Sequence, residues 1–279
     1  MILDNPAAQI QATFVCLLAA AAWLRPLPLR RRLLVTALAL IAIAAVALAQ
    51  FSRHALSPNA SSILKNWLPV ALLLVPYWQV GRFVTRSDPR MERRLAAFDS
   101  RFFRTLGIRP ASIAISPVVG ACLELAYVTV YPLIPLGLGA LYLTGLERYA
   151  NYYWIVILGS TYVCLAITPF VQAMPPWRLN DCEKFRVPPS RVEKLNQWIL
   201  RRGSIQVITF PSAHVASSLA ASLVLLRLEP WLGMTFLALA FSIIVAALVG
   251  GYHYAADALL AAVVAIVVFW ATVSMAKPS

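Results

Sequence analysis

The chain has 279 residues, of which 61% are hydrophobic and 13% are charged, and its formal net charge is +13. So much apolar surface cannot be buried in a water-soluble core of this size, and the composition therefore excludes a soluble domain. Apolar runs of about 20 residues cross the hydrocarbon layer as helices, because the backbone must satisfy its own hydrogen bonds there. The expected fold class is an all-α, polytopic membrane helix bundle.

Apolar runs of spanning length predict about eight transmembrane helices. In chain order they cover residues 8–24, 33–51, 61–84, 113–143, 151–173, 211–228, 231–249 and 254–275. The run 113–143 is too long for one straight span, and it contains Pro117, Pro132 and Pro135. We interpret it as one kinked helix, with a helix followed by a re-entrant segment as the alternative.

The segment 86–109 separates the third run from the fourth and has a different character. Charged residues alternate there with apolar ones at helical spacing, namely Leu95, Phe98, Phe102, Phe103 and Leu106. This pattern predicts an amphipathic helix lying on the membrane interface, and an ordinary solvated linker is the alternative.

Glu124 stands within the apolar run 113–143. A charged carboxylate at the centre of a span costs about 2.5–3.5 kcal/mol on insertion scales, so we expect this side chain to face the bundle and to be protonated or hydrogen-bonded. A structural role and a functional role are both compatible with this position.

The positive charge lies almost entirely between the apolar runs, where it indicates topology and an attraction for anions. No aromatic or groove-reading motif accompanies it, so we expect no nucleic-acid partner. The cysteines form no CxxC pair and support neither a disulfide framework nor a zinc site. We expect Cys16, Cys122 and Cys164 to be buried in helices and Cys182 to lie in a polar loop. Asp4, with no Lys or Arg before the first run, favours a retained helix over a cleaved signal peptide.

The first motif with chemical meaning is Phe210-Pro211-Ser212-Ala213-His214, at the start of an apolar run. Proline followed by serine suits the first turn of a helix, where backbone N–H groups have no partner within the helix. Those N–H groups and the helix dipole attract anions, and the Ser212 hydroxyl adds a donor. His214 would then lie close enough to a bound phosphate to give a proton to a leaving oxygen.

The second motif is His253-Tyr254-Ala255-Ala256-Asp257, which opens the last apolar run. Residues four apart share one face of a helix, so the carboxylate of Asp257 can meet the imidazole of His253. A carboxylate on one ring nitrogen selects the tautomer and leaves the other nitrogen nucleophilic. For a histidine alone, a hydrogen-bonded packing role would be the simpler interpretation.

Three segments together resemble the signature of the type 2 phosphatidic acid phosphatase (PAP2) superfamily, KxxxxxxRP, PSGH and SRxxxxxHxxxD. They are Lys184 with Arg191, the Phe210–His214 motif, and His253 with Asp257. The resemblance covers residues 61–275. Within the superfamily, the chain is most similar to the branch that includes inositol phosphorylceramide synthases. That branch also carries a PPW-like turn and an FPSxH form of the middle motif.

The resemblance implies a six-helix catalytic core in residues 61–279, with an interfacial helix at 86–109 and a catalytic loop at 174–210. Residues 1–60 would add two N-terminal transmembrane helices. By the mechanism of the superfamily, His253 would attack phosphorus to form a phosphohistidine, Asp257 would orient it, and His214 would protonate the leaving group. The substrate phosphate would be bound by Lys184, Arg191, Ser212 and Ala213. No metal and no other cofactor is implied.

The chain departs from the signature at three places. Ala213 replaces the motif glycine, Val192 replaces the motif proline, and Ala246-Ala247 stand where Ser-Arg is expected. The motif arginine binds phosphate in the superfamily, so its loss at Ala247 calls for a substitute. The basic residues near the motifs that are available for this role are Arg186, Arg201 and Arg202.

These observations predict an integral-membrane phosphatase or phosphotransferase that acts on a lipid phosphate or lipid diphosphate. A lipid head-group transferase of the inositol phosphorylceramide synthase type is one alternative. A non-enzymatic lipid carrier or binder on the same scaffold is another, because the motif arginine is missing. Turnover of lipid phosphates, head-group exchange and binding without turnover would separate the three.

Topology depends on the number of spans. With eight spans, the turn 25–32, the segment 86–109 and the loop 184–202 lie on one side of the membrane, together with His214 and His253. The positive-inside rule then predicts a plasma-membrane or inner-membrane protein whose active site faces the cytoplasm. The resemblance favours the opposite face, because many members of the superfamily work on the outer or lumenal side.

Overall fold

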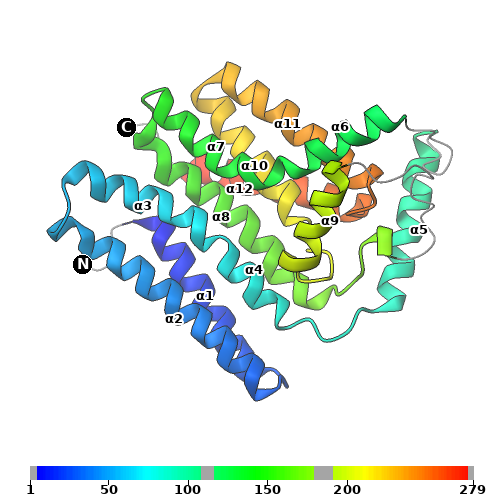
Figure 1. Cartoon of the computed structure of the whole chain (residues 1–279), viewed down its shortest axis with the longest axis horizontal. Helices are drawn as coiled ribbons and strands as arrows, with labels where there is room; N and C mark the ends of the chain where they lie inside the picture. Colours follow the sequence, from blue (N-terminus) through cyan, green and yellow to red (C-terminus); the bar gives the residue numbers. More distant parts are fainter. Residues whose placement is uncertain (1–4, 108–115, 179–190, 276–279) are drawn as a thin grey trace.

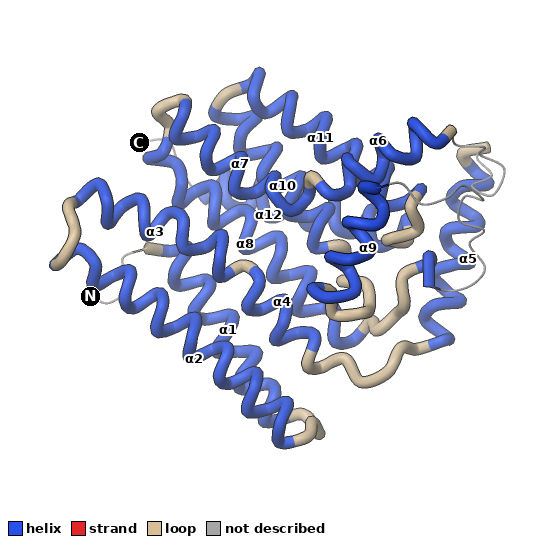
Figure 2. Tube along the Cα trace, viewed as in Figure 1, coloured by secondary structure: helices blue, strands red, loops and turns tan. Residues whose placement is uncertain are grey.

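The computed structural model describes residues 5–107, 116–178 and 191–275. Within these ranges all regular structure is helical, and no strand occurs (Figures 1 and 2). The chain is thus an all-α helix bundle, as its composition predicts.

Five helical segments among the described residues are long and apolar enough to cross a membrane. Four of them are single helices, namely α1 (Pro6–Leu24), α2 (Leu29–Phe51), α11 (Pro230–Val249) and α12 (Ala255–Met275). The fifth, Glu147–Phe170, contains α8 (Ala150–Ile167) and a short 3-10 helix at either end. A sixth span results if α6 (Pro117–Val128) and α7 (Val130–Leu143) cross the membrane together.

Two of the eight expected spans do not have the length of a span. The run 61–84 is split into α3 (Pro58–Leu72) and α4 (Leu74–Gly81), because the ring of Pro76 cannot accommodate the carbonyl of Leu72 in a continuous helix. The run 211–228 forms α10 (Ala213–Leu228), whose 16 residues reach only about 24 Å. Length and composition therefore support five or six spans in the described chain rather than eight.

The proline-bearing run is kinked, as predicted. Its described part forms α6 and α7, which meet at Thr129 with a bend of 56°. Pro132 lies four residues after Val128, the last residue of α6, so it removes the hydrogen bond that would have continued the helix. A bend of this size is compatible with either a broken span or a re-entrant segment.

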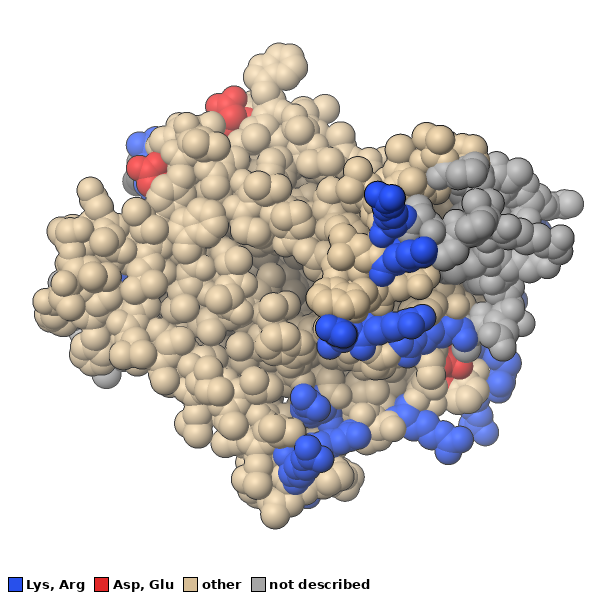
Figure 3. Space-filling view, viewed as in Figure 1, with Lys and Arg blue, Asp and Glu red and all other residues tan. Residues whose placement is uncertain are grey.

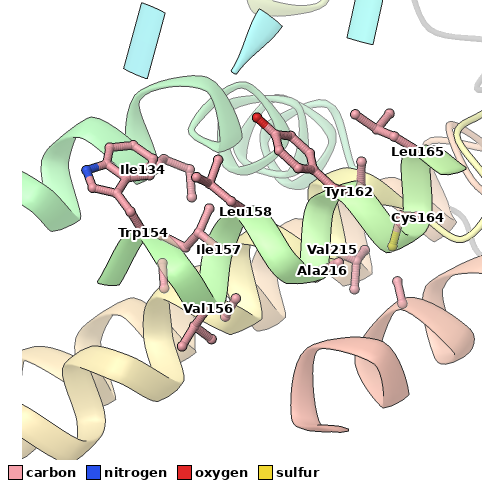
Figure 4. Close-up of a cluster of buried hydrophobic side chains, with 14 of the residues drawn as sticks. Ile134, Trp154, Val156, Ile157, Leu158, Tyr162, Cys164, Leu165, Val215 and Ala216 are labelled. Atoms are coloured by element: carbon pink, nitrogen blue, oxygen red, sulfur yellow. The ribbon is translucent and has the colours of Figure 1, made fainter. Parts of the chain in front are cut away.

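Helix α8 forms the centre of the bundle. Within its span, 61% of the residues are buried, against 22–33% in the four other spans. Figure 4 shows Trp154 and Tyr162 on one side of α8 and Val156 and Cys164 on the other. The neighbouring α10 is buried along most of its length and exposes little surface to a membrane. This explains how α10 can be shorter than a full span.

Two amphipathic helices lie outside the set of spans. Helix α5 (Pro89–Thr105) begins at Asp88, whose Oδ1 accepts a hydrogen bond from the N–H of Arg90 at 2.8 Å. Helix α9 (Arg191–Gly203) precedes the loop that leads into α10. The helical character expected for residues 86–109 is thus confirmed over 89–105, while residues 108 and 109 lie outside the described chain. The location of α5 on a membrane interface stays a prediction.

The basic segments gather at one end of the bundle, and Figure 3 shows most Lys and Arg side chains of the visible face on its lower and right parts. The α1–α2 turn meets the end of α4, where Arg31 Nη1 donates to the carbonyls of Arg82 and Val84 at 3.2 and 2.7 Å. The segment after α4 pairs with the end of the α8 span through Asp88 N–H and the carbonyl of Gln172 at 2.7 Å. The structure therefore brings these segments to the same end, as the sequence predicts.

Candidate active site

The start of α10 places Ser212 at the centre of several hydrogen bonds. The Ser212 hydroxyl caps the helix by accepting the N–H of Val215 at 3.4 Å, and the Ser212 N–H donates to the carbonyl of Asp257 at 3.2 Å. The N–H of Ala213 donates to Thr209 Oγ1 at 3.0 Å. Most N–H groups of this first turn thus already have partners, so the helix terminus offers fewer donors to an anion than the sequence predicts.

His253 and Asp257 form a buried pair. Asp257 Oδ2 lies 3.0 Å from Nδ1 of His253, and the two side chains are 0% and 5% exposed, respectively. His253 precedes α12 rather than lying on it, so the pair spans the helix start. Ser212 Oγ lies 3.3 Å from Nε2 of the same imidazole. With the proton on Nδ1, the imidazole donates to the carboxylate, and the lone pair on Nε2 accepts a hydrogen bond from the Ser212 hydroxyl.

His214 faces this pair from the first turn of α10. Its ring centre lies 6.1 Å from that of His253, and the two rings are nearly perpendicular at 86°. The rings of Tyr127 and Tyr131 contact His214 edge-on, with centroid distances of 6.2 and 5.9 Å. The two tyrosines of the kinked segment thus pack against the imidazole of His214, which lies beside that of His253.

The two histidines line one pocket at the basic end of the bundle. Its empty volume is about 460 Å³, open solvent at its mouth included. Side chains from α4, α6 and the loops around α9 line its wall, among them Tyr77, Tyr127, Trp177 and Arg178. Among the described residues, the pocket lining therefore combines aromatic and aliphatic side chains with two imidazoles and one guanidinium.

The sequence proposed several basic residues for phosphate binding, and those that belong to the described part of the chain do not line this pocket. Arg191 is exposed at the first residue of α9, and Arg201 and Arg202 are exposed near its end. The guanidinium of Arg202 lies 4.9 Å from the ring centre of Trp198. None of these three arginines is among the residues that line the pocket. Lys184 and Arg186 lie outside the described residues.

Arg178 is a charged pocket residue that the sequence analysis did not name. It is half-buried, and it follows the turn Pro175-Pro176-Trp177 directly. It lies in the segment 174–210, which the sequence analysis expected to form a catalytic loop without assigning a role to this residue. The available signal was a basic residue directly after the proline-bearing turn Pro175-Pro176-Trp177, near the motifs that carry the two histidines.

The departures from the signature have structural counterparts. Ala213 is the first residue of α10, so a glycine is not needed there for a left-handed backbone. Ala247 is buried in a cluster with Tyr127 and Tyr252, against which Trp177 packs. The rings of Tyr127 and Tyr252 are stacked at 4.2 Å. Aromatic side chains thus occupy the surroundings of the position where the signature has arginine.

Glu124 faces the bundle and is hydrogen-bonded, as expected. The Tyr252 hydroxyl lies 2.8 Å from each of its carboxylate oxygens, and Asn196 Nδ2 donates to Oε2 at 3.0 Å. The carboxylate therefore joins α6 and α9 to the residue directly before His253. The role shown by these contacts is structural.

Helix α5 reaches the site through two carboxylates that the sequence analysis did not single out. Glu92 Oε1 accepts the N–H of Met174 at 2.9 Å, and Asp99 Oδ1 accepts the N–H of Ala255 at 2.8 Å. Burial and, to a smaller extent, the charge of Asp257 raise the pKa of Asp99 to about 7. The signal in the sequence was a pair of acidic residues in a strongly basic segment. Glu92 and Asp99 are seven positions apart, a spacing that places them on the same side of a helix.

The fold and the site define a membrane-type helix bundle with a histidine-based site at its basic end. A scan against known protein families matches residues 93–271 with the PAP2 superfamily, and the chain belongs to that superfamily. The match includes both histidines of the pocket, Asp257 and Arg178, and it begins within α5. Searches of curated proteins and of solved structures found no match. The similarity to the inositol phosphorylceramide synthase branch and the domain division at residue 60 stay predictions.

Proposed function

We propose that this chain is an integral-membrane enzyme that hydrolyses or transfers the phosphoryl group of a lipid phosphate or lipid diphosphate through a phosphohistidine at His253. The observation that supports this proposal best is the hydrogen-bonded chain from Asp257 through His253 to Ser212. His253 and His214 both line the same pocket. Membership of the PAP2 superfamily agrees with phosphatase-type chemistry on a lipid phosphate.

In the first step, the Nε2 lone pair of His253 attacks phosphorus while the bond from phosphorus to the lipid oxygen breaks. His214 gives its proton to that oxygen, and the Asp257 carboxylate stabilises the positive charge that develops on the His253 imidazole. In the second step, neutral His214 takes a proton from water, whose oxygen attacks phosphorus and releases the Nε2 atom. An acceptor alcohol in place of water would complete a transfer instead of a hydrolysis.

The purified protein is expected to release inorganic phosphate from at least one member of a panel of lipid phosphates and diphosphates in mixed micelles.

Activity should survive EDTA and be blocked by vanadate, which imitates pentacoordinate phosphorus. Among the described residues, no three His, Cys, Asp or Glu side chains are grouped to hold a metal ion. Exchange of head groups without phosphate release would favour the transferase, and binding without turnover would favour a carrier. Loss of activity in EDTA that a divalent ion restores would contradict the phosphohistidine route.

We further propose that the site faces the cytoplasm, since the basic segments and the pocket lie at one end of the bundle. The cysteines allow a test. Cys164 is buried, whereas Cys16 and Cys122, which were expected to be buried, lie exposed on apolar helices, where a thiol behaves as a small hydrophobe. A variant with these three replaced by alanine keeps only Cys182, in the polar loop.

In sealed right-side-out vesicles, an impermeant maleimide should fail to label this single-cysteine variant until the membrane is opened. Labelling after opening serves as the control that Cys182 is reactive. Labelling in intact vesicles would place the loop outside, and the preference of the superfamily for the outer or lumenal face would then be the better guide.

A further inference from the structure

The described part of the chain contributes a single fixed positive charge to the pocket. Among the described residues that line it, Arg178 is the one Lys or Arg, and it shares the pocket with His214 and His253. We propose that Arg178 is the residue that binds the phosphate of the substrate, in the role left open by Ala247. This inference rests on the proposed function, since it names the group that holds the phosphate at the same site.

The backbone before Arg178 is attached to the segment that carries His253. The Trp177 N–H donates to the carbonyl of Gly251 at 3.0 Å, and the Tyr254 hydroxyl donates to the carbonyl of Met174 at 3.0 Å. Gly251 has a φ of +64°, and a side chain there would lie 3.3 Å from the backbone nitrogen of Trp177. The residues on both sides of the nucleophile thus position the turn that presents Arg178.

The guanidinium itself is oriented by two neighbours. Nη1 donates to the carbonyl of Gln206 at 3.4 Å, Nη2 donates to Oε1 of the same residue, and the group lies 5.0 Å from the ring centre of Trp177. Gln206 has a φ of 69°, the one positive value found for a non-glycine residue in the described chain. Its side-chain amide donates to the carbonyls of Leu200 and Ser204, both at 3.2 Å, which holds this conformation.

This arrangement leaves the guanidinium able to bind an anion. A guanidinium has five N–H donors, and the contacts with Gln206 engage one on each terminal nitrogen. Among the described residues, no carboxylate forms an ion pair with Arg178. The stack on Trp177 also places the charge beside the aromatic cluster that surrounds Ala247. A planar fork that is already oriented can form paired hydrogen bonds with two phosphate oxygens.

The test replaces Arg178 by glutamine and measures two quantities, the KM for the best lipid phosphate and the concentration of vanadate that inhibits half of the activity. Both should rise about 10–100-fold, the range expected for a lost hydrogen bond between charged groups. Arg148→Gln is the matched control. The guanidinium of Arg148 also lies 5.0 Å from the centre of a neighbouring ring, that of Tyr149. Arg148 precedes α8, however, whereas Arg178 follows α8 at the other end of the bundle. Vanadate binding to the wild-type protein and to Arg178→Gln, followed by tryptophan fluorescence, supplies a readout that needs no turnover, and the variant should bind vanadate more weakly.

Chemical rescue separates binding from a structural role. Free guanidinium at a non-denaturing concentration should restore part of the activity of Arg178→Ala and none of that of His253→Ala. An unchanged KM and unchanged vanadate inhibition in folded Arg178→Gln would overturn the inference while the proposed function stands, as would a loss found only in Arg202→Gln. If Arg178→Gln does not fold, Arg178→Lys tests whether the planar guanidinium is required, because lysine keeps the charge but cannot form the paired hydrogen bonds. Vanadate inhibition of Arg178→Lys at the wild-type concentration would contradict the inference. A wild-type protein that neither turns over lipid phosphates nor binds vanadate would instead refute the proposed function.

Discussion

Replacing His253 by alanine is expected to lower turnover by on the order of 10³-fold or more, the largest loss among single substitutions in this chain. The variant lacks the proposed nucleophile, and neither Ser212 nor His214 is hydrogen-bonded to Asp257 in the way that His253 is. Release of phosphate from the lipid substrate measures the effect. His54→Ala is the control, because this third histidine lies after α2, at the opposite end of the bundle from the α1–α2 turn.

The covalent step can be observed directly. Wild-type protein quenched during turnover of a ³²P-labelled substrate should carry a phosphoryl group that is lost in acid and kept in base, as expected for a phosphorus–nitrogen bond. His253→Ala should show no such adduct, and Asp257→Asn should form it more slowly because the imidazole is no longer stabilised as a cation. An adduct of equal size in His253→Ala would contradict the assignment of the nucleophile.

The second large effect is expected for His214→Ala, and its size should depend on the leaving group. A general acid contributes about 10²–10⁴-fold where the leaving oxygen needs a proton. For a lipid phosphate, whose alcohol is a poor leaving group, the loss should fall in that range. For an activated aryl phosphate the loss should be much smaller, because the phenolate can leave without protonation.

The comparison of the two substrates in one preparation provides its own control for folding. The labelled phosphohistidine should still form in His214→Ala from the activated substrate. Tyr131→Phe is a further control, since it keeps the ring edge against His214 and changes only the hydroxyl. Equal losses on both substrates would contradict the proton-donor role of His214 and would indicate that its ring only positions other groups.

The sequence by itself determined the fold class and the pairing of His253 with Asp257, because both depend on local patterns. Hydrophobic runs predict helices in a membrane regardless of how the helices pack. Pro132 disrupts its own helix, so the bend between α6 and α7 could be predicted from the position of the prolines. His253 and Asp257 are four residues apart, and this spacing brought their side chains to 3.0 Å although the helix starts between them.

Span lengths were predicted less well than the helices themselves. The sequence suggested about eight spans, and length and composition support five or six in the described chain. Helix α10 explains part of the difference, since its burial against α8, α11 and α12 removes the need to match the thickness of a bilayer. Whether an apolar helix faces lipid or other helices is a property of the packed bundle, and hydrophobicity alone does not distinguish the two.

Only the tertiary structure decided which residues surround the histidines. Asp99 meets Ala255 across 156 positions of the chain, and Glu124 meets Tyr252 across 128. Arg178 enters the pocket because backbone contacts with Gly251 and side-chain contacts with Gln206 place it there. The sequence analysis instead proposed basic residues by their distance along the chain from the motifs. No periodic pattern links residues on different helices, so the source of positive charge in the pocket depended on how the helices and loops pack together.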